Sequence, residues 1–314
     1  MSVTRVAAID IGTVTCRLLL ADVSERGQVT ELYRGSAITN LGEDVDANGY
    51  LLDVAMQRVD EQIAKYMDII GENSSAEHPV TIVAMATSAS RDASNAADFV
   101  AMLECRGVHL SVIPGEKEAA LSFLGASCSF AGERLLVTDV GGGSSELIYG
   151  IGGQEPLCKH SFNVGCRRVT ERFLKSDPPS TDELQAAREW FEPQFAEFFA
   201  ELKRRGYKID RMVSVAGTAT SMVSIEQEME VYDRSRVHGA CVTLESLQAI
   251  GQRLASMPLE ERLCVTGLQP GRAHVIVAGA LILESLVRQV GAGSYTVSEQ
   301  DILYGMVMDA AKRV

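Results

Sequence analysis

The stretch RLLVTDVGGGSSELIYG, residues 134–150, decides the fold. An apolar run ends at Asp139, three glycines and two serines follow, and a second apolar run begins after Glu146. Glycine permits positive φ, so we expect a tight turn whose successive N–H groups form a concave anion-binding nest. If the two runs pair as a hairpin, both acids lie at the rim of that nest. Carboxylates beside a phosphate cradle indicate a divalent cation, most naturally Mg²⁺.

The same order of events occurs near the N-terminus. Residues 5–23, RVAAIDIGTVTCRLLLADV, contain an apolar run, Asp10, Gly12, the hydroxyls of Thr13 and Thr15, and a second apolar run. Two related hairpins half a chain apart predict two similar lobes that face one cleft. The plainer alternative is two ordinary glycine-rich hairpin turns. The repetition with a matched Asp favours the functional interpretation.

Two common phosphate-binding motifs are excluded at these turns. A Walker loop needs Lys and Ser/Thr after its second glycine, and a dinucleotide fingerprint leads into a helix rather than a strand.

Length and composition agree with a globular α/β protein. The 314 residues are 46% hydrophobic and 23% charged, which allows one or two sizeable cores. The net charge of −13 disfavours nucleic-acid binding. No apolar run reaches bilayer length, and Asp10 interrupts any signal-peptide pattern, so we expect a cytoplasmic protein without membrane contact. Seven cysteines without CxxC spacing indicate reduced thiols.

Hydrophobic periodicity predicts alternating strands and helices. Strands are expected at 7–11, 17–23, 29–34, 81–86 and 109–113, and helices at 51–70 and 95–106. A capping box at Ser180 and Glu183 starts a long helix further on. We expect one lobe over residues 1–129 and a second over 130–314.

Eight blocks of sequence carry a family resemblance. They are DIGTVTCRLL (10–19), ATSASRDA (86–93), PGEKEAALSFLG (114–125), DVGGGSSEL (139–147), NVGCRRVTERFL (163–174), AGTATSMVSI (216–225), VHGACVTLESL (237–247) and GRAHVIVAGALILESL (271–286). Their order resembles the exopolyphosphatase and guanosine pentaphosphate phosphohydrolase family of the actin, sugar kinase and Hsp70 superfamily.

The resemblance implies two ribonuclease H-like (actin-like ATPase) lobes around a central cleft, and a homodimer. It implies a Mg²⁺-dependent phosphoanhydride hydrolase that releases terminal orthophosphate. Inorganic polyphosphate is the first choice of substrate and guanosine pentaphosphate the second.

The candidate site has three kinds of residue. Glu118 matches the family's catalytic glutamate, and Asp139, Glu146 and Asp10 are the candidate metal ligands. The candidate phosphate ligands are Gly12, Thr13, Thr15, Arg91, Gly141, Gly142, Gly143, Ser144 and Ser145.

Each role has a structural alternative. Glu118 alone would be read as a first-turn acid that stabilises its own helix N-terminus. Arg91 could pair with Asp92 or Asp98 instead of a phosphoryl oxygen. The small residues at 216–221 could contact a distal phosphate or a nucleoside, or simply pack.

Three departures from the family pattern leave other functions open. Val14 stands where the family usually has Asn, Lys117 where a second acid is common, and Leu303 where an Arg is expected. A non-catalytic phosphate-ligand sensor is therefore one alternative. A sugar kinase or actin-like ATPase is another, which would need an adenine pocket.

Overall fold

The computed structural model describes residues 3–313, which form two compact units. The first unit comprises Met1–Gly125 together with Ile302–Val314, and the second comprises Ala126–Asp301. The sequence-based division into 1–129 and 130–314 differs from these units mainly in the last helix.

The first unit is built on a five-stranded sheet with the order β3-β2-β1-β4-β5. Its elements are β1 (Val3–Ile11), β2 (Thr15–Ser24), β3 (Val29–Ile38), α1 (Val45–Asn48), α2 (Asp53–Glu72), β4 (Val80–Ala86), α3 (Ser88–Asp92), α4 (Ala96–Glu104), β5 (Leu110–Val112), α5 (Gly115–Ser127) and α13 (Ile302–Ala311). Strands β1, β2 and β3 are antiparallel neighbours, whereas β1, β4 and β5 run parallel. The predicted strands and helices of this region are confirmed within a few residues.

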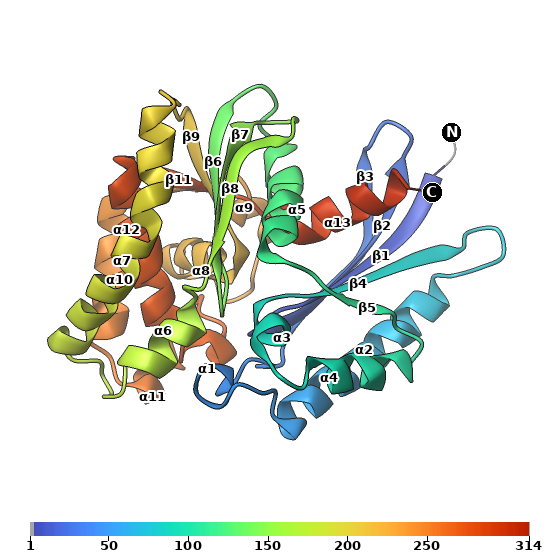
Figure 1. Ribbon diagram of the computed structural model, residues 1–314, viewed down its shortest axis with the longest axis horizontal. Coiled ribbons are helices and arrows are strands. Elements are labelled where there is room, and N and C mark those ends of the chain that lie inside the picture. Colours follow the sequence, from blue (N-terminus) through green and yellow to red (C-terminus); the bar gives the residue numbers. More distant parts are fainter. Residues whose placement is uncertain (1–2, 314) are drawn as a thin grey trace. The chain divides into compact units, whose positions relative to one another are not determined.

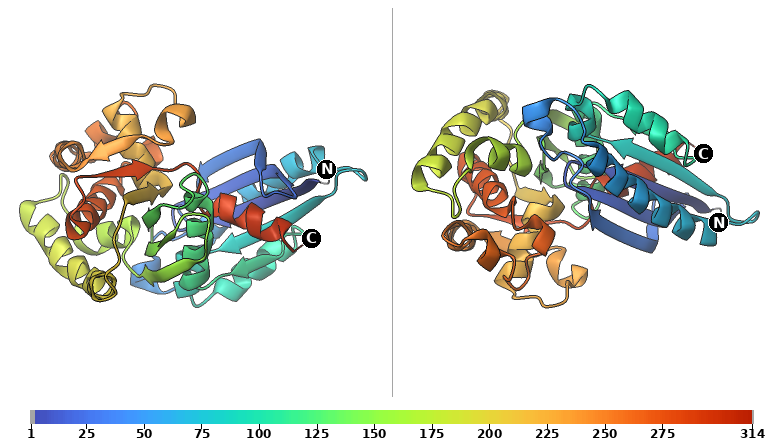
Figure 2. Two further views of the ribbon diagram at one scale, coloured as in Figure 1. Left: turned by 90° about the horizontal axis from the view of Figure 1, so that it is seen from above. Right: turned by 90° about the horizontal axis from the view of Figure 1, so that it is seen from below.

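Strand β1 is buried on both faces, and its alternation assigns each residue to one of two cores. Ala7 and Ile9 join the core that contains the apolar residues of α2 and α4. Val6 and Ala8 join the core that contains α13. Figures 1 and 2 show α13 on the face of the sheet opposite α2 and α4. The first unit is therefore a three-layer α/β arrangement.

The last helix belongs to the first unit because its apolar face completes that core. Leu303 is fully buried there, and Lys117 of α5 forms an ion pair with Asp309 at 3.2 Å. A Cβ on Gly305 would lie 2.0 Å from the backbone oxygen of Leu121, so α5 and α13 pack in close contact. A predicted boundary at residue 129 could not reveal this return of the chain.

The second unit has a six-stranded sheet with the order β10-β11-β9-β6-β7-β8. Its elements are β6 (Arg134–Val140), β7 (Ser145–Ile151), β8 (Pro156–Phe162), α6 (Cys166–Phe173), α7 (Thr181–Arg204), β9 (Arg211–Val215), α8 (Ala216–Glu226), α9 (Arg234–Val237), β10 (Cys241–Thr243), α10 (Leu244–Ala255), α11 (Leu259–Arg262), a 3₁₀ turn (Pro270–Arg272), α12 (Ile276–Val290) and β11 (Ser294–Val297). One large apolar core joins the sheet to α6, α7, α8, α10 and α12. The capping box of Ser180 and Glu183 at the start of α7 is present.

The two sheets repeat one topology. In the first unit β3-β2-β1-β4-β5 follow one another across the sheet, and in the second β8-β7-β6-β9-β11 do the same. In both, three antiparallel strands come first in the sequence, and the first of them then pairs with a parallel strand. This confirms the two related hairpins and the prediction of two similar α/β lobes.

Two further features of the structure concern membrane-spanning helices and cysteines. Within residues 3–313 no helix combines the length and apolar character needed to span a membrane. The seven cysteines all lie within residues 3–313, and none of them is joined in a disulfide there.

Candidate functional site

The Gly12 turn joins β1 and β2 of the first unit as predicted. The Gly12 amide donates to the Thr15 oxygen at 2.9 Å, and Ile11 pairs with Cys16 at the hairpin end. The loop 39–44 packs on this turn, because the Gly42 amide donates to the Thr13 oxygen at 2.9 Å and a Cβ on Gly42 would lie 2.2 Å from the Thr13 methyl group. The turn is thus held in one conformation by its neighbour.

The second turn, at residues 141–145, is also a hairpin turn and is braced by the segment after β8. The Gly141 amide donates to the Ser144 oxygen at 3.0 Å. The first amides of α6 donate to the turn's carbonyls, Cys166 to Gly141 at 2.9 Å and Arg167 to Gly142 at 2.8 Å.

Further contacts complete this brace. Arg168 Nε donates to the Gly143 oxygen at 2.9 Å, and Ser145 Oγ donates to the Val164 oxygen at 2.5 Å.

The predicted use of positive φ in these turns is wrong. Positive φ occurs at other glycines, including Gly132 and Gly153, but Gly12, Gly141, Gly142 and Gly143 are not among them. Close approach restricts side chains at Gly141 and at Gly165, which packs against this turn. A Cβ on Gly141 would lie 3.1 Å from the Ser144 oxygen, and one on Gly165 would lie 2.3 Å from the Gly142 oxygen.

The two hairpins place different partners opposite their matching acids. In the first, Asp10 faces Arg17, whose Nη2 and Nε lie 2.5 and 3.0 Å from Asp10 Oδ2. In the second, Asp139 faces Glu146 directly across the ladder, and both are buried. Asp10 is therefore compensated by a guanidinium, whereas Asp139 and Glu146 form a pair of like charges on one face of the sheet.

The acid pair is a donor set that suits Mg²⁺. Ser161, the next residue across the sheet, donates from Oγ to Glu146 Oε1 at 2.6 Å and orients that carboxylate. No cluster of three or more His, Cys, Asp or Glu side chains able to hold a metal occurs in residues 3–313. Mg²⁺ commonly takes only one or two carboxylates and fills its other positions with water and phosphate oxygens. The pair fits that mode.

Glu118 and Arg91 meet at the edge of the first sheet. Ile11, Ala86 and Val112 are in register in β1, β4 and β5, so the segments that follow them emerge side by side. Arg91 lies in α3 after β4, and Glu118 lies in the first turn of α5 after β5.

Their side chains form an ion pair that sequence reasoning did not consider. Arg91 Nη1 is 2.6 Å from Glu118 Oε2 and 3.1 Å from the Ile113 oxygen. Glu118 is 9% exposed, so this is a largely desolvated carboxylate with a fixed cation. The neighbouring Lys117 points elsewhere, to Asp309.

In the second unit the loop after β9 reaches the same sheet edge as the glycine turn. Asp139 is in register with Val215, and α8 begins at Ala216, which has φ of +66°. A Cβ on Gly217 would lie 1.7 Å from Arg272 Nη1, so this guanidinium lies directly against the start of α8. The small residues at 216–221 thus pack closely and bring an arginine to this edge.

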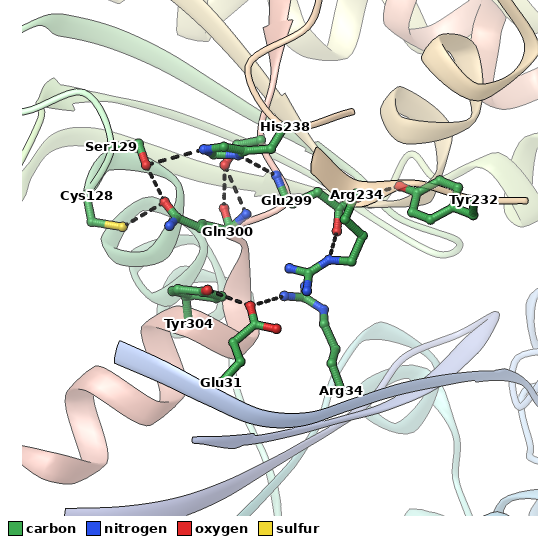
Figure 3. A network of polar contacts seen from close by, with 11 residues as sticks. Glu31, Arg34, Cys128, Ser129, Tyr232, Arg234, His238, Glu299, Gln300 and Tyr304 are labelled. Atoms are coloured by element: carbon green, nitrogen blue, oxygen red, sulfur yellow. Dashed lines mark hydrogen bonds and ion pairs between the residues drawn. The ribbon is translucent and has the colours of Figure 1, made fainter. Parts of the chain in front are cut away.

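The His238 side chain lies in a network of polar contacts within the second unit (Figure 3). Its Nδ1 accepts the Glu299 amide at 3.2 Å, and Ser129 Oγ lies 3.5 Å from Nε2. Ser129 also donates to Gln300 Oε1 at 2.5 Å. Burial lowers the pKa of His238, and the Glu299 carboxylate opposes that shift. The network ties the start of the second unit to its end.

Sequence reasoning missed several residues that shape these edges. No contact was assigned to Arg17, Gly165 or Arg272, although all three lie in the quoted blocks. Arg17 could have been found from the repeat, since it occupies the position that Glu146 holds in the second hairpin. The contacts of Gly165 and Arg272 depend on tertiary packing, which the sequence pattern does not show.

The chain matches known proteins over its whole length. The model of the Ppx/GppA phosphatase family matches residues 20–314. Exopolyphosphatase 2 of Mycobacterium tuberculosis is 37% identical over 330 aligned residues, covering 99% of this chain and 100% of that protein. A bifunctional 3-dehydroquinate synthase/phosphatase of Fusobacterium nucleatum is 33% identical over 98% of this chain and 46% of that protein.

Solved structures are also similar to this chain over nearly its whole length. An exopolyphosphatase-like protein has a TM-score of 0.89 and 31% identity, covering 100% of this chain and 99% of that one. The Aquifex aeolicus member of the Ppx/GppA family has a TM-score of 0.78 and 27% identity over 99% of both chains. With two α/β units and a family match across both, the chain belongs to the Ppx/GppA phosphatase family of hydrolases.

Proposed function

We propose that this protein is an exopolyphosphatase that releases terminal orthophosphate from inorganic polyphosphate. The observation that carries the proposal is Glu118, a desolvated carboxylate that an arginine holds at the sheet edge where the Gly12 turn also lies. The similarity to exopolyphosphatase 2 across 99% of the chain supports the choice of substrate.

The chain's own groups divide the work of hydrolysis. Glu118 takes the proton of a water whose oxygen attacks the terminal phosphorus, while the terminal phosphoanhydride bond breaks and the shortened polyphosphate leaves. The Gly12 turn of the first unit and the Gly141 turn of the second each offer small residues and amides for phosphate oxygens. Asp139 and Glu146 would hold Mg²⁺, which when bound neutralises charge on phosphate oxygens.

A net charge of −13 would repel a polyanion unless cations are concentrated locally. Four arginines lie at the two sheet edges beside the candidate acids, Arg17 and Arg91 in the first unit and Arg168 and Arg272 in the second. Arginine forms the geometrically favourable bidentate contacts with phosphate. We infer that these four residues, together with bound Mg²⁺, balance the acidic side chains at these edges when the polyanionic substrate binds.

The test is phosphate release from short polyphosphate, long polyphosphate and guanosine pentaphosphate, with and without Mg²⁺. Turnover of polyphosphate supports the proposal. Turnover of guanosine pentaphosphate alone selects the phosphohydrolase alternative, and tight binding without turnover under any divalent metal selects the sensor.

Glu118→Gln is expected to lower kcat by about 10²- to 10⁴-fold while substrate binding persists, because the amide is nearly isosteric but cannot accept a proton. Glu116→Gln is the matched control, since Glu116 lies in the same first turn of α5 and is exposed. Steady-state kinetics and direct binding to both variants check this. Activity of Glu118→Gln within a few-fold of wild type removes Glu118 from the mechanism.

A further inference from the structure

We propose that Arg91 is a positioning residue for the base: it holds the Glu118 carboxylate in its charged form and in one orientation. This rests on the proposed function, in which Glu118 activates water. It goes beyond the role of Arg91 as a phosphate ligand, because here the guanidinium acts on the reaction through another side chain.

The donor geometry supports this role. Nη1 of Arg91 carries two hydrogens, and its two acceptors are Glu118 Oε2 at 2.6 Å and the Ile113 oxygen at 3.1 Å. Both hydrogens of that nitrogen are therefore used. Any phosphoryl oxygen that Arg91 binds must be reached from Nη2 or Nε, while Nη1 stays on the base.

Both ends of the ion pair are fixed by backbone. Ile113 follows β5, and its amide donates to the Ala86 oxygen at 3.0 Å, so the carbonyl that anchors Arg91 is part of the sheet edge. The Glu118 amide donates to the Pro114 oxygen at 3.1 Å in the first turn of α5. The guanidinium thus spans two elements of the first unit, and its position sets that of the carboxylate.

Both side chains of the Arg91–Glu118 ion pair are largely buried. The Arg91 and Glu118 side chains are 18% and 12% exposed. A carboxylate in such a place is costly to ionise without a partner, and a neighbouring cation favours the ionised form by about one to three pH units. Removal of Arg91 is therefore expected to favour the protonated form of Glu118 over part of the working pH range and to loosen the orientation of its carboxyl group.

The experiment compares Arg91→Gln and Arg91→Lys with wild type over a pH series. For Arg91→Gln we expect kcat to fall about ten-fold or more near neutral pH, KM to change little, and the acid limb of the kcat profile to move up by about one pH unit or more. Arg91→Lys retains a cation and is expected to recover part of both effects. Added methylguanidinium is expected to rescue Arg91→Gln in part.

Arg106→Gln is the matched control, because Arg106 is an exposed arginine of the same unit whose ion pair is with Asp60 of α2 and not with a residue of this sheet edge. A higher KM with unchanged kcat and an unmoved acid limb would overturn the proposal and leave Arg91 as a phosphate ligand only.

A second measurement does not depend on turnover. The Glu118 side-chain carboxyl is identified in ¹³C spectra as the signal missing from Glu118→Gln, and it is titrated in wild type and in Arg91→Gln. A higher titration midpoint in Arg91→Gln supports the proposal, and an unchanged midpoint overturns it.

The same variants separate the two claims. If Glu118→Gln remains active, the proposed function of Glu118 fails. If Glu118→Gln is inert and Arg91→Gln changes only KM, the positioning role alone fails.

Discussion

Asp10 and Asp139 occupy matching places in the two hairpins, yet one faces Arg17 and the other faces Glu146. The residue opposite each Asp determines whether that carboxylate already has a cationic partner across the hairpin. Asp10 is bonded to a guanidinium, whereas Asp139 and Glu146 place two carboxylates opposite each other, which is a donor set that a divalent cation accepts. The sequence repeat predicts both acids, and the strand register shows which residue faces each of them. We therefore place the proposed Mg²⁺ on Asp139 and Glu146 rather than on Asp10.

Asp139→Asn and Glu146→Gln are each expected to raise the Mg²⁺ concentration needed for half-maximal activity, because each removes one anionic donor from a hard cation. A Mg²⁺ titration of phosphate release measures this. Glu133→Gln is the control, since Glu133 lies in the same unit and pairs with Arg211. If neither variant shifts the titration, the acids are hairpin residues and the metal assignment is incorrect.

Val14 lies in the Gly12 turn, at the position where the family usually has Asn. It is 5% exposed, and its oxygen accepts the amides of Thr39 and Asn40, both at 3.0 Å. Thr39 Oγ1 is buried and has no hydrogen-bond partner among the described residues. This hydroxyl is therefore available to the side-chain amide of Val14→Asn, in addition to the substrate. A hydrogen bond to a charged group contributes about 1.5–3 kcal/mol.

Val14→Asn is therefore expected to change apparent substrate affinity or Mg²⁺ dependence by about ten-fold or more while turnover persists in both forms. Val14→Ala controls for the loss of volume. An inert wild type that Val14→Asn activates would instead indicate a silenced site. An active wild type with no response would show that Val14 serves packing alone.

At the scale of elements, hairpins, strands and long helices could be predicted from the sequence, but the contacts that brace them could not. Short apolar runs bounded by glycine-rich turns reveal β1, β2, β6 and β7, because such runs are local information. The support of the Gly141 turn by α6 is not local: it joins a turn to a helix more than twenty residues later. The prediction of positive φ failed for another reason: glycine also permits close backbone contacts, here between Gly141 and Ser144 within the turn and between Gly165 and Gly142.

Gly165→Ala tests this brace. Its new Cβ would lie 2.3 Å from the Gly142 oxygen and 2.5 Å from the Gly143 carbonyl carbon, and backbone atoms cannot move aside as a flexible side chain can. We expect the Gly141 turn to be displaced, with KM for polyphosphate raised about ten-fold or more and stability reduced by about 1–3 kcal/mol. Gly206→Ala, Gly132→Ala and other positive-φ sites are unsuitable controls because they add backbone strain, so Gly293→Ala, where no atom lies within 4 Å, is used instead. Unchanged kinetics would show that the turn does not contact phosphate.

At the scale of the whole molecule, the chain leaves the first unit after Gly125 and returns to it at Ile302. A division by sequence order assigns the last helix to the second lobe, because nothing local in residues 302–311 indicates which sheet they cover. Their apolar face matches β1 and β2 of the first unit, and Tyr304 donates to Glu31 Oε1 at 2.5 Å within that unit (Figure 3). The family's arginine position at Leu303 is thus part of a core in this chain.

Leu303 tests that placement, because it is fully buried and packs with Val6, Ala8 and Leu19 of the first sheet. Leu303→Ala is expected to destabilise the first unit by about 2–5 kcal/mol, through lost apolar burial and the cavity that remains. Urea unfolding monitored by a probe in each unit measures this, with Leu32→Ala as control because Leu32 is 41% exposed on β3. Leu303→Arg, which restores the family residue, would bury a charge in an apolar core and is expected to lower stability without improving substrate affinity. A loss below about 1 kcal/mol for Leu303→Ala would contradict its core role, and tighter phosphate binding by a stable Leu303→Arg would return this position to the substrate site.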